Sequence, residues 1–249
     1  MKVVGLVSGG KDSCYNMMKC VEDGCQLICL ANLCPPKEKD EIDSFMYQSV
    51  AHQTVELYGE AIGVPLLRQE ISGTAVNQDL QYSVTKNDEV EDLYVLLSRV
   101  KREFPDVEGV SVGAILSEYQ KNRVENICSR IGLKVICKLW KREESSLLEE
   151  MIKNGINAVL VKVAAIGLTR EHIGKNLKEV RDHLLMLNSK YGVSVCGEGG
   201  EYESFVVDCP LFKKRICIDE YSVVSESENY CRFGEVAYMH PTKFHLEDK

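Results

Sequence analysis

The first part of the chain constrains the fold more than any other stretch. Residues 2–7 form an apolar, valine-rich run of strand length. The small-residue segment Ser-Gly-Gly-Lys-Asp-Ser follows at residues 8–13, and residues 14–21 have the composition of a helix that can end at Gly24. The sequence therefore predicts a strand, a glycine loop and a helix in immediate succession.

This succession is suited to binding phosphate groups. Glycine lets the backbone approach an anion closely, and the first turn of a helix offers unpaired N–H groups and the positive end of its dipole. Lys11 adds a positive charge, and Asp12 is a candidate ligand for Mg²⁺ held against phosphates. An ordinary turn is the alternative, but the flanking strand and helix disfavour it. We expect phosphate contacts along the whole loop: Ser8, Gly9, Gly10, Lys11, Asp12 and Ser13.

Strands alternate with helices through the rest of the N-terminal half. The predicted strands are 26–33, 66–71, 109–114 and 134–138, and the predicted helices are 44–62, 88–100 and 118–131. Residues 72–87 are polar and predict a loop near the ligand or a mobile lid. The alternation predicts a Rossmann-like α/β domain over residues 1–138, with a five-stranded parallel sheet, helices on both faces, and ligands beyond the carboxyl ends of the strands.

The pattern changes near residue 139. A helix is predicted at 145–154, a strand at 158–165, a helix at 171–188, and short strands at 193–196, 204–208 and 215–218. We therefore expect a smaller, substrate-binding α/β domain over residues 139–235. Residues 236–249 are expected to form a loosely held tail.

Composition excludes several classes of protein. The net charge of −8 over 249 residues argues against direct nucleic-acid binding. The N-terminal apolar run is too short for a signal peptide, and we expect no membrane partner and a cytoplasmic location. The 11 cysteines contain no Cys-x-x-Cys pair, so buried reduced thiols are favoured over structural zinc.

A second group of candidate residues surrounds the predicted fourth strand. Gly113 lies near its end, where a glycine permits close approach to a ligand. Ser117 and Gln120 have the spacing of a helix cap, which is sufficient to explain both. Tyr119 and Arg123 share one face of the following helix. A solvated helix face is the alternative for this pair.

A third group is the run Gly-Glu-Gly-Gly-Glu-Tyr-Glu at residues 197–203. Its glycines and carboxylates cannot form a hydrophobic core and fit a regular strand poorly. An exposed acidic turn is the alternative, but apolar runs at 193–195 and 205–207 would hold the carboxylates in place. Glu198, Glu201 and Glu203 are candidates for holding a cationic substrate or guiding ammonia.

Together, these motifs resemble those of a known family. The loop at residues 8–13 resembles the pyrophosphate loop of the N-type ATP pyrophosphatases, which cleave ATP between its α- and β-phosphates. With Ser-x-Tyr-Gln-x-x-Arg-x-Glu from Ser117 and the run at 197–203, the chain resembles the diphthine–ammonia ligase family from Lys2 to about Ile218. The resemblance implies an adenine nucleotide alpha hydrolase-like fold, ATP and Mg²⁺ as cofactors, and adenine between Ala31–Asn32 and Gly113.

The resemblance also implies a reaction. Family members amidate the diphthine carboxylate of translation elongation factor 2 through an acyl-adenylate, releasing AMP and pyrophosphate. The resemblance implies catalytic roles for Lys11, Asp12 and Glu201. Because the chain starts with the nucleotide domain, we expect free ammonium as the nitrogen source. The residues expected to bind substrate are Ser117, Tyr119, Gln120, Arg123, Glu198, Gly199, Gly200, Glu201, Tyr202 and Glu203.

Two alternatives share the phosphate loop. A tRNA-thiolating ATP pyrophosphatase usually needs a catalytic cysteine pair and often a Cys-x-x-Cys zinc site, whereas this chain is acidic and lacks the zinc spacing. A non-catalytic adenine nucleotide sensor would not need the glutamates of residues 197–203.

Overall fold

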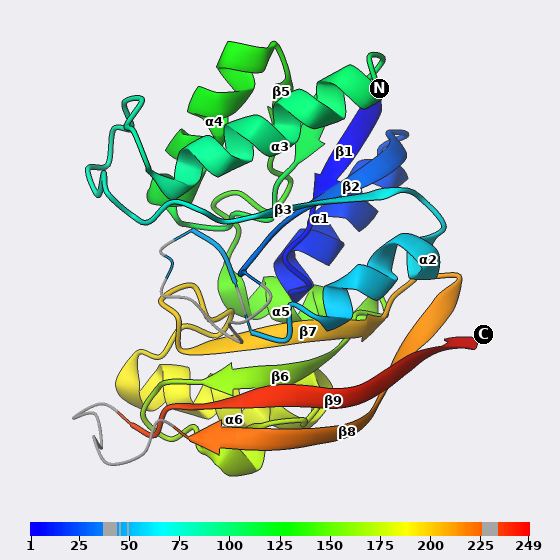
Figure 1. Ribbon diagram of the computed structural model, residues 1–249. Coiled ribbons are helices and arrows are strands. Elements are labelled where there is room, and N and C mark those ends of the chain that lie inside the picture. The colour runs from blue at the N-terminus through cyan, green and yellow to red at the C-terminus, as the bar shows by residue number, and fades with distance from the viewer. Residues whose placement is uncertain (37–43, 45, 49, 226–233) are drawn as a thin grey trace.

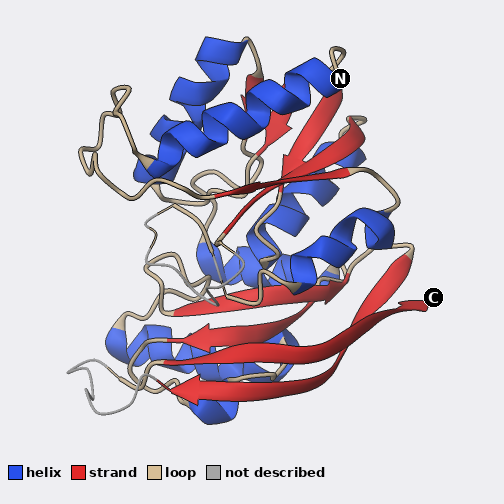
Figure 2. Cartoon of the chain, viewed as in Figure 1, coloured by secondary structure: helices blue, strands red, loops and turns tan. Residues whose placement is uncertain are grey.

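The computed structural model describes residues 1–36, 44, 46–48, 50–225 and 234–249 (Figure 1). Two sheets organise the chain, and helices are packed around both of them (Figure 2). Among the described residues, none of the helices has the combined length and apolar character that crossing a bilayer requires.

The first sheet is the predicted five-stranded parallel sheet. Its strand order is β3-β2-β1-β4-β5, and every neighbouring pair is parallel. The first strand is therefore central, and the loop that follows it opens at the carboxyl edge of the sheet. The strands are β1 (Lys2–Leu6), β2 (Gln26–Cys34), β3 (Leu66–Glu70), β4 (Gly109–Ser111) and β5 (Lys134–Ile136).

Helices cover both faces of this sheet, as predicted. Side chains alternate along a strand, so Leu30 of β2 packs into one core while Cys29 and Ala31 pack into the other. The first core contains residues of α1 and α2, and the second contains residues of α3 and α4. The helices are α1 (Lys11–Glu22), α2 (Tyr58–Ile62), α3 (Glu89–Glu103) and α4 (Glu118–Ile131).

The long helix predicted over residues 44–62 is wrong. In the described part of this stretch, the helical segments are a 3₁₀ turn, η1 (Thr54–Leu57), and α2. Ala51 has φ 59°, a left-handed conformation that a continuous right-handed helix cannot contain. The spacing of the apolar residues indicates which side chains are buried, but it does not reveal this break in the helix. Residues 45 and 49 lie outside the described residues.

The second α/β unit has an antiparallel sheet with the strand order β7-β6-β9-β8. No strand forms at residues 193–196, where the chain turns instead. The helix predicted from residue 171 starts at Leu177 because Asn176 and Glu179 form a capping box there. The elements are α5 (Glu144–Lys153), β6 (Asn157–Val163), η2 (Arg170–His172), α6 (Leu177–Tyr191), β7 (Tyr202–Asp208), β8 (Lys214–Ser225) and β9 (Ala237–Asp248).

The expected tail at residues 236–249 is instead a strand of the second sheet. β9 pairs with β8 from Ala237↔Ser225 to Asp248↔Lys214, and it also pairs with β6. Pro241 and the charged residues around it give this stretch a poor strand composition. Long-range pairing with two neighbours overrides that local preference, which a sequence alone does not reveal.

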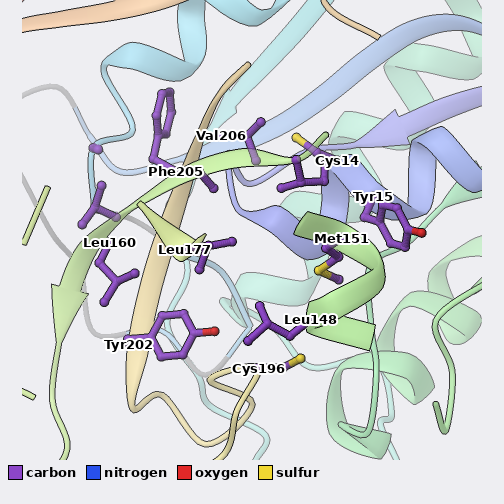
Figure 3. Packing of buried hydrophobic residues seen from close by; sticks show 14 of the residues in the cluster. Cys14, Tyr15, Leu148, Met151, Leu160, Leu177, Cys196, Tyr202, Phe205 and Val206 are labelled. Carbon is purple, nitrogen blue, oxygen red and sulfur yellow. The ribbon is translucent and has the colours of Figure 1, made fainter. Parts of the chain in front are cut away.

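The two units share one hydrophobic core. Cys14 and Tyr15 of α1 belong to the same buried cluster as Met151 of α5 and Phe205 of β7 (Figure 3). The edge strand β7 also bonds to the phosphate loop, because the Val206 N–H donates to the Gly9 carbonyl at 2.8 Å. The second unit is therefore fixed directly against the loop that follows β1.

Candidate active site

The phosphate loop, residues 8–13, is held in shape by its own serines. The Ser13 hydroxyl donates to the Gly10 carbonyl at 2.9 Å, and the Gly10 N–H donates to the Ser8 hydroxyl at 3.2 Å. Gly9 has φ 97°, in the region that favours glycine. A Cβ on Gly113 would lie 2.5 Å from the Ser13 nitrogen, so glycine is needed where the chain leaving β4 passes the start of α1.

Lys11 is the buried cation of this loop, with only 2% of its surface exposed. Its amino group donates to Asp12 Oδ2 at 2.9 Å and to the Cys196 carbonyl, and it lies 5.1 Å from the centre of the Tyr202 ring. Burial alone would lower the pKa of Lys11, but the Asp12 carboxylate and the other neighbours raise it above its usual value. Lys11 therefore stays charged and connects the loop to the second unit.

The two carboxylate oxygens of Asp12 differ in their hydrogen bonding. Oδ2 accepts from Lys11, whereas Oδ1 is buried without a hydrogen-bond partner among the described residues. Burial raises the pKa of Asp12, and the charge of Lys11 opposes that rise. A buried oxygen without a partner beside a phosphate loop fits a ligand of a hard cation such as Mg²⁺.

The glycine–glutamate loop, residues 197–203, is shaped partly by its own side chains. Gly197 and Gly200 have φ 76° and 82°. The Glu201 carboxylate accepts from the N–H groups of Ser194 at 3.0 Å and Gly199 at 2.8 Å. Glu201 is therefore used to close the turn, and its side chain is not part of the cavity wall.

The remaining acidic residues of this loop do face the cavity. Glu198 Oε2 accepts from the Leu116 N–H at 2.8 Å, and burial raises the pKa of this half-buried carboxyl. Glu203 lies 3.8 Å from the Lys162 amino group. The Tyr202 hydroxyl donates to the Val195 carbonyl at 2.8 Å, which aims its ring at Lys11.

The motif that begins at Ser117 is divided between two roles. Ser117 caps α4 by accepting from the Gln120 N–H at 3.2 Å, and the Gln120 side chain lines the cavity. Arg123 is fully buried, stacks on Tyr119, and donates to the carbonyls of Asn77 and Asp79. The Arg123 side chain therefore binds the segment at residues 72–87 and fixes it against α4.

These elements enclose a cavity of about 450 Å³ beyond the carboxyl ends of β1, β2 and β4. The predicted site residues in its wall are Ser8, Lys11, Asp12, Ser13, Gly113, Gln120, Glu198, Gly199, Gly200, Tyr202 and Glu203. The predicted site residues outside its wall are Gly9, Gly10, Ala31, Asn32, Ser117, Tyr119, Arg123 and Glu201.

Ala31 and Asn32, expected beside adenine, have structural roles. Ala31 is fully buried in the core, and the Asn32 side chain donates to the Val7 carbonyl and accepts from Arg68, both at 2.9 Å. The apolar part of the wall consists instead of Leu6, Val7, Leu33, Met46, Val112, Ala114 and Val124. The rule that ligands lie at the carboxyl ends of parallel strands would have indicated Leu33 and Val112.

Gln48 was also missed by sequence reasoning. Its side-chain amide donates to the Ser204 carbonyl of β7 at 2.9 Å, so it connects the wall of the first domain to that of the second. The Lys11 N–H donates to the Ser204 hydroxyl at 3.2 Å. No local pattern in the sequence marks Gln48, because its role depends on a strand more than 150 residues away.

The fold and this cavity define an α/β nucleotide-binding protein whose phosphate loop is completed by a second domain. The family model described as "Diphthamide synthase N-terminal domain" matches residues 1–135, and that described as "Diphthamide synthase C-terminal domain" matches residues 143–235. The chain therefore belongs to the diphthamide synthase family.

Three relatives share the name "Diphthine--ammonia ligase". The chain is 54% identical to "Diphthine--ammonia ligase" of Danio rerio over 100% of this chain and 98% of the relative. It is 51% identical to the Homo sapiens protein of that name, over 100% of this chain and 94% of the relative. It is 55% identical to the Schizosaccharomyces pombe protein over 96% of this chain, but spans only 39% of that longer relative.

One solved structure gives a much weaker match. It is described as a predicted subunit of tRNA methyltransferase from Methanocaldococcus jannaschii, and it covers 84% of this chain and 98% of its own. The TM-score is 0.38 at 11% identity, which is too low to support a functional inference.

Proposed function

We propose that this protein amidates the diphthine carboxylate of translation elongation factor 2 in the cytoplasm, using ATP and ammonia. The carboxylate is adenylated with release of pyrophosphate, and ammonia then displaces AMP to give diphthamide. The structural observation that carries the proposal is the shared cavity. Lys11 of the phosphate loop and Glu198 of the glycine–glutamate loop line the same space.

The nucleotide fits the first-domain side of this cavity. The apolar wall at Leu33, Val112 and Ala114 suits adenine, and the Lys11 charge and the N-terminal end of α1 suit the phosphates. Asp12 would hold Mg²⁺, which supplies charge neutralisation at the phosphates. A carboxylate is a poor acyl donor, and Lys11 favours its activation by stabilising negative charge on the departing pyrophosphate.

The second-domain side fits a cationic acceptor. Diphthine carries a trimethylammonium group beside the carboxylate that reacts. Glu203 supplies a carboxylate at this wall, and Tyr202 lines the same cavity. Opposite charge and an aromatic face are the two features that favour a quaternary ammonium group.

Cys196 argues against the thiolating alternative. It is the cysteine of the cavity wall, but its side chain is buried and donates to the Glu144 carbonyl at 3.5 Å. Burial raises the pKa of the Cys196 thiol to about 12. A thiol of this kind is protonated at neutral pH, whereas a sulfur nucleophile must be a thiolate.

The proposal is tested by the nucleotide product. The protein is incubated with ATP, ammonium and elongation factor 2 bearing diphthine, and the same factor without diphthine is the control. We expect AMP and pyrophosphate in amounts that match the diphthamide formed, and only background hydrolysis in the control. ADP and phosphate as products would refute an ATP pyrophosphatase reaction.

A further inference from the structure

The carboxylates of the glycine–glutamate loop differ in what they contact. Glu201 accepts two backbone N–H groups and supports the turn. Glu203 lies beside Lys162. Glu198 accepts one N–H, that of Leu116, and forms no ion pair within the part of the chain that the structure describes. It is thus fixed in position without a direct ion pair to a lysine or arginine among the described residues.

The surroundings of Glu198 favour a cation. Asp12 and Glu144 add negative charge nearby, and Lys11 provides the opposing positive charge. Burial and the charge of Asp12 raise the pKa of Glu198, which makes its carboxylate a better proton acceptor. The carboxylate also lies on the same cavity wall as Gly199 and Gly200, which are exposed to solvent.

The amidation proposed above needs such a group. Ammonium is the main form of ammonia at neutral pH, and it cannot attack an acyl carbon because it has no lone pair. Resting on that proposed function, we propose that Glu198 binds the incoming ammonium ion and accepts its proton. Glu198 thereby delivers neutral ammonia next to the activated carboxylate.

The proposed step transfers a proton to Glu198 and replaces a C–O bond at the acyl carbon with a C–N bond. One N–H bond of ammonium breaks, and its proton moves to the Glu198 carboxylate. The nitrogen lone pair forms the C–N bond with the acyl carbon, and the C–O bond to AMP breaks, with its electron pair leaving on the AMP phosphate. The nitrogen then loses a second proton to water, which gives the neutral amide.

Glu198→Gln tests this role because glutamine keeps the size and can still accept from the Leu116 N–H. Exchange of labelled pyrophosphate into ATP, with diphthine-bearing factor and without ammonium, should remain close to wild type. Amide formation from ammonium should fall by about a hundredfold or more, the usual contribution of a proton acceptor. Hydroxylamine, which is largely uncharged at neutral pH, should restore acyl transfer in this variant, with a hydroxamate as the product.

Two further variants complete the experiment. Glu149→Gln removes an exposed carboxylate of α5 that pairs with Arg181 of α6, and it should match wild type with both amines. Glu203→Gln should change product formation from ammonium and from hydroxylamine equally, since we assign Glu203 no proton transfer. A loss of product formation that occurs with ammonium but not with hydroxylamine should thus be specific to the Glu198 variant.

Three results would overturn the assignment. Loss of pyrophosphate exchange in Glu198→Gln would show that the residue serves adenylation or binding of the factor. Equal loss with ammonium and hydroxylamine would show a structural role, and full activity would show no role. A wild-type protein without exchange would instead refute the proposed amidation, on which the role of Glu198 rests.

Discussion

At the scale of single residues, Lys11 connects the two halves of the cavity. Its amino group contacts Asp12 in its own loop and the Cys196 carbonyl in the second unit. A charged donor with 2% exposure is costly unless it has partners or a ligand. The local sequence places Lys11 at the start of α1, but its contacts with Cys196 and Tyr202 depend on the second unit.

We predict that Lys11→Met weakens ATP binding by about tenfold or more. A hydrogen bond to a charged group contributes about 1.5–3 kcal/mol, and about 1.4 kcal/mol corresponds to tenfold in affinity. Calorimetric titration with ATP measures the change, after thermal unfolding has confirmed a folded variant. Lys19→Met, near the C-terminal end of the same helix, is the control and should bind ATP normally. Normal ATP binding by folded Lys11→Met would contradict this role.

The glutamates show the limit of sequence reasoning at this scale. The motif at residues 197–203 and its acidic character were recognisable, and the structure brings it to the phosphate loop. The motif does not indicate which glutamate turns inward, and Glu198 and Glu203 line the cavity whereas Glu201 does not. That outcome depends on the N–H groups of Ser194 and Gly199, whose orientation appears only once the turn has formed.

At the scale of elements, α4 and the 72–87 segment form one unit. Arg123 donates to the Asp79 carbonyl at 3.0 Å, Asn122 donates to the Leu80 carbonyl at 3.1 Å, and Asn126 donates to the Tyr82 carbonyl at 3.4 Å. Spacing on the helix correctly placed Tyr119 and Arg123 on one face. It could not tell whether that face meets a ligand or another segment of the chain.

We predict that Arg123→Met lowers the free energy of unfolding by on the order of 2 kcal/mol, because buried carbonyls lose charged donors. Hydrogen exchange should accelerate at residues 77–82 while pyrophosphate exchange remains measurable. Lys121→Met, which breaks a partly exposed ion pair with Glu125 and a contact with the Trp140 ring, should change stability little. An Arg123→Met protein of normal stability that cannot bind elongation factor 2 would instead support the substrate-binding role expected from sequence.

At the scale of the whole molecule, Glu150 of α5 joins the two units at a second point. Its carboxylate accepts from Tyr15 of α1 at 2.5 Å and from Arg142 at 2.5 Å, and Lys19 of α1 lies 3.4 Å away. The hydrogen bonds from Arg142, with help from Tyr15 and Lys19, lower the pKa of Glu150 to about 2.

This lowered pKa gives a pH-dependent contribution to stability. A carboxyl with a folded pKa below its unfolded value of about 4.3 stabilises the fold above that value, and the contribution is lost as pH falls toward about 2. Glu150→Gln should therefore lower the unfolding temperature at neutral pH, and the difference from wild type should shrink in that acid range. Glu149→Gln, one position away and facing Arg181, is the control. A difference independent of pH would show that the ion pairs are not its cause.

The domain arrangement was only partly accessible from sequence. Strand–helix alternation was sufficient for the parallel sheet, since each crossover is local and its handedness is fixed. The second sheet depends on pairings such as Lys214↔Asp248 and Ala158↔Val206, which join distant segments. The contact of Val206 with Gly9, which makes one cavity from two units, is likewise long-range.

The most direct test of a shared adenylating site is exchange of labelled pyrophosphate into ATP. The wild-type protein is given ATP, Mg²⁺, labelled pyrophosphate and elongation factor 2 bearing diphthine, with ammonium left out. We predict exchange that requires the diphthine group, because the carboxylate is adenylated before ammonia takes part. Exchange that is unaffected by the factor, or that never occurs without ammonium, would contradict an acyl-adenylate formed in this cavity.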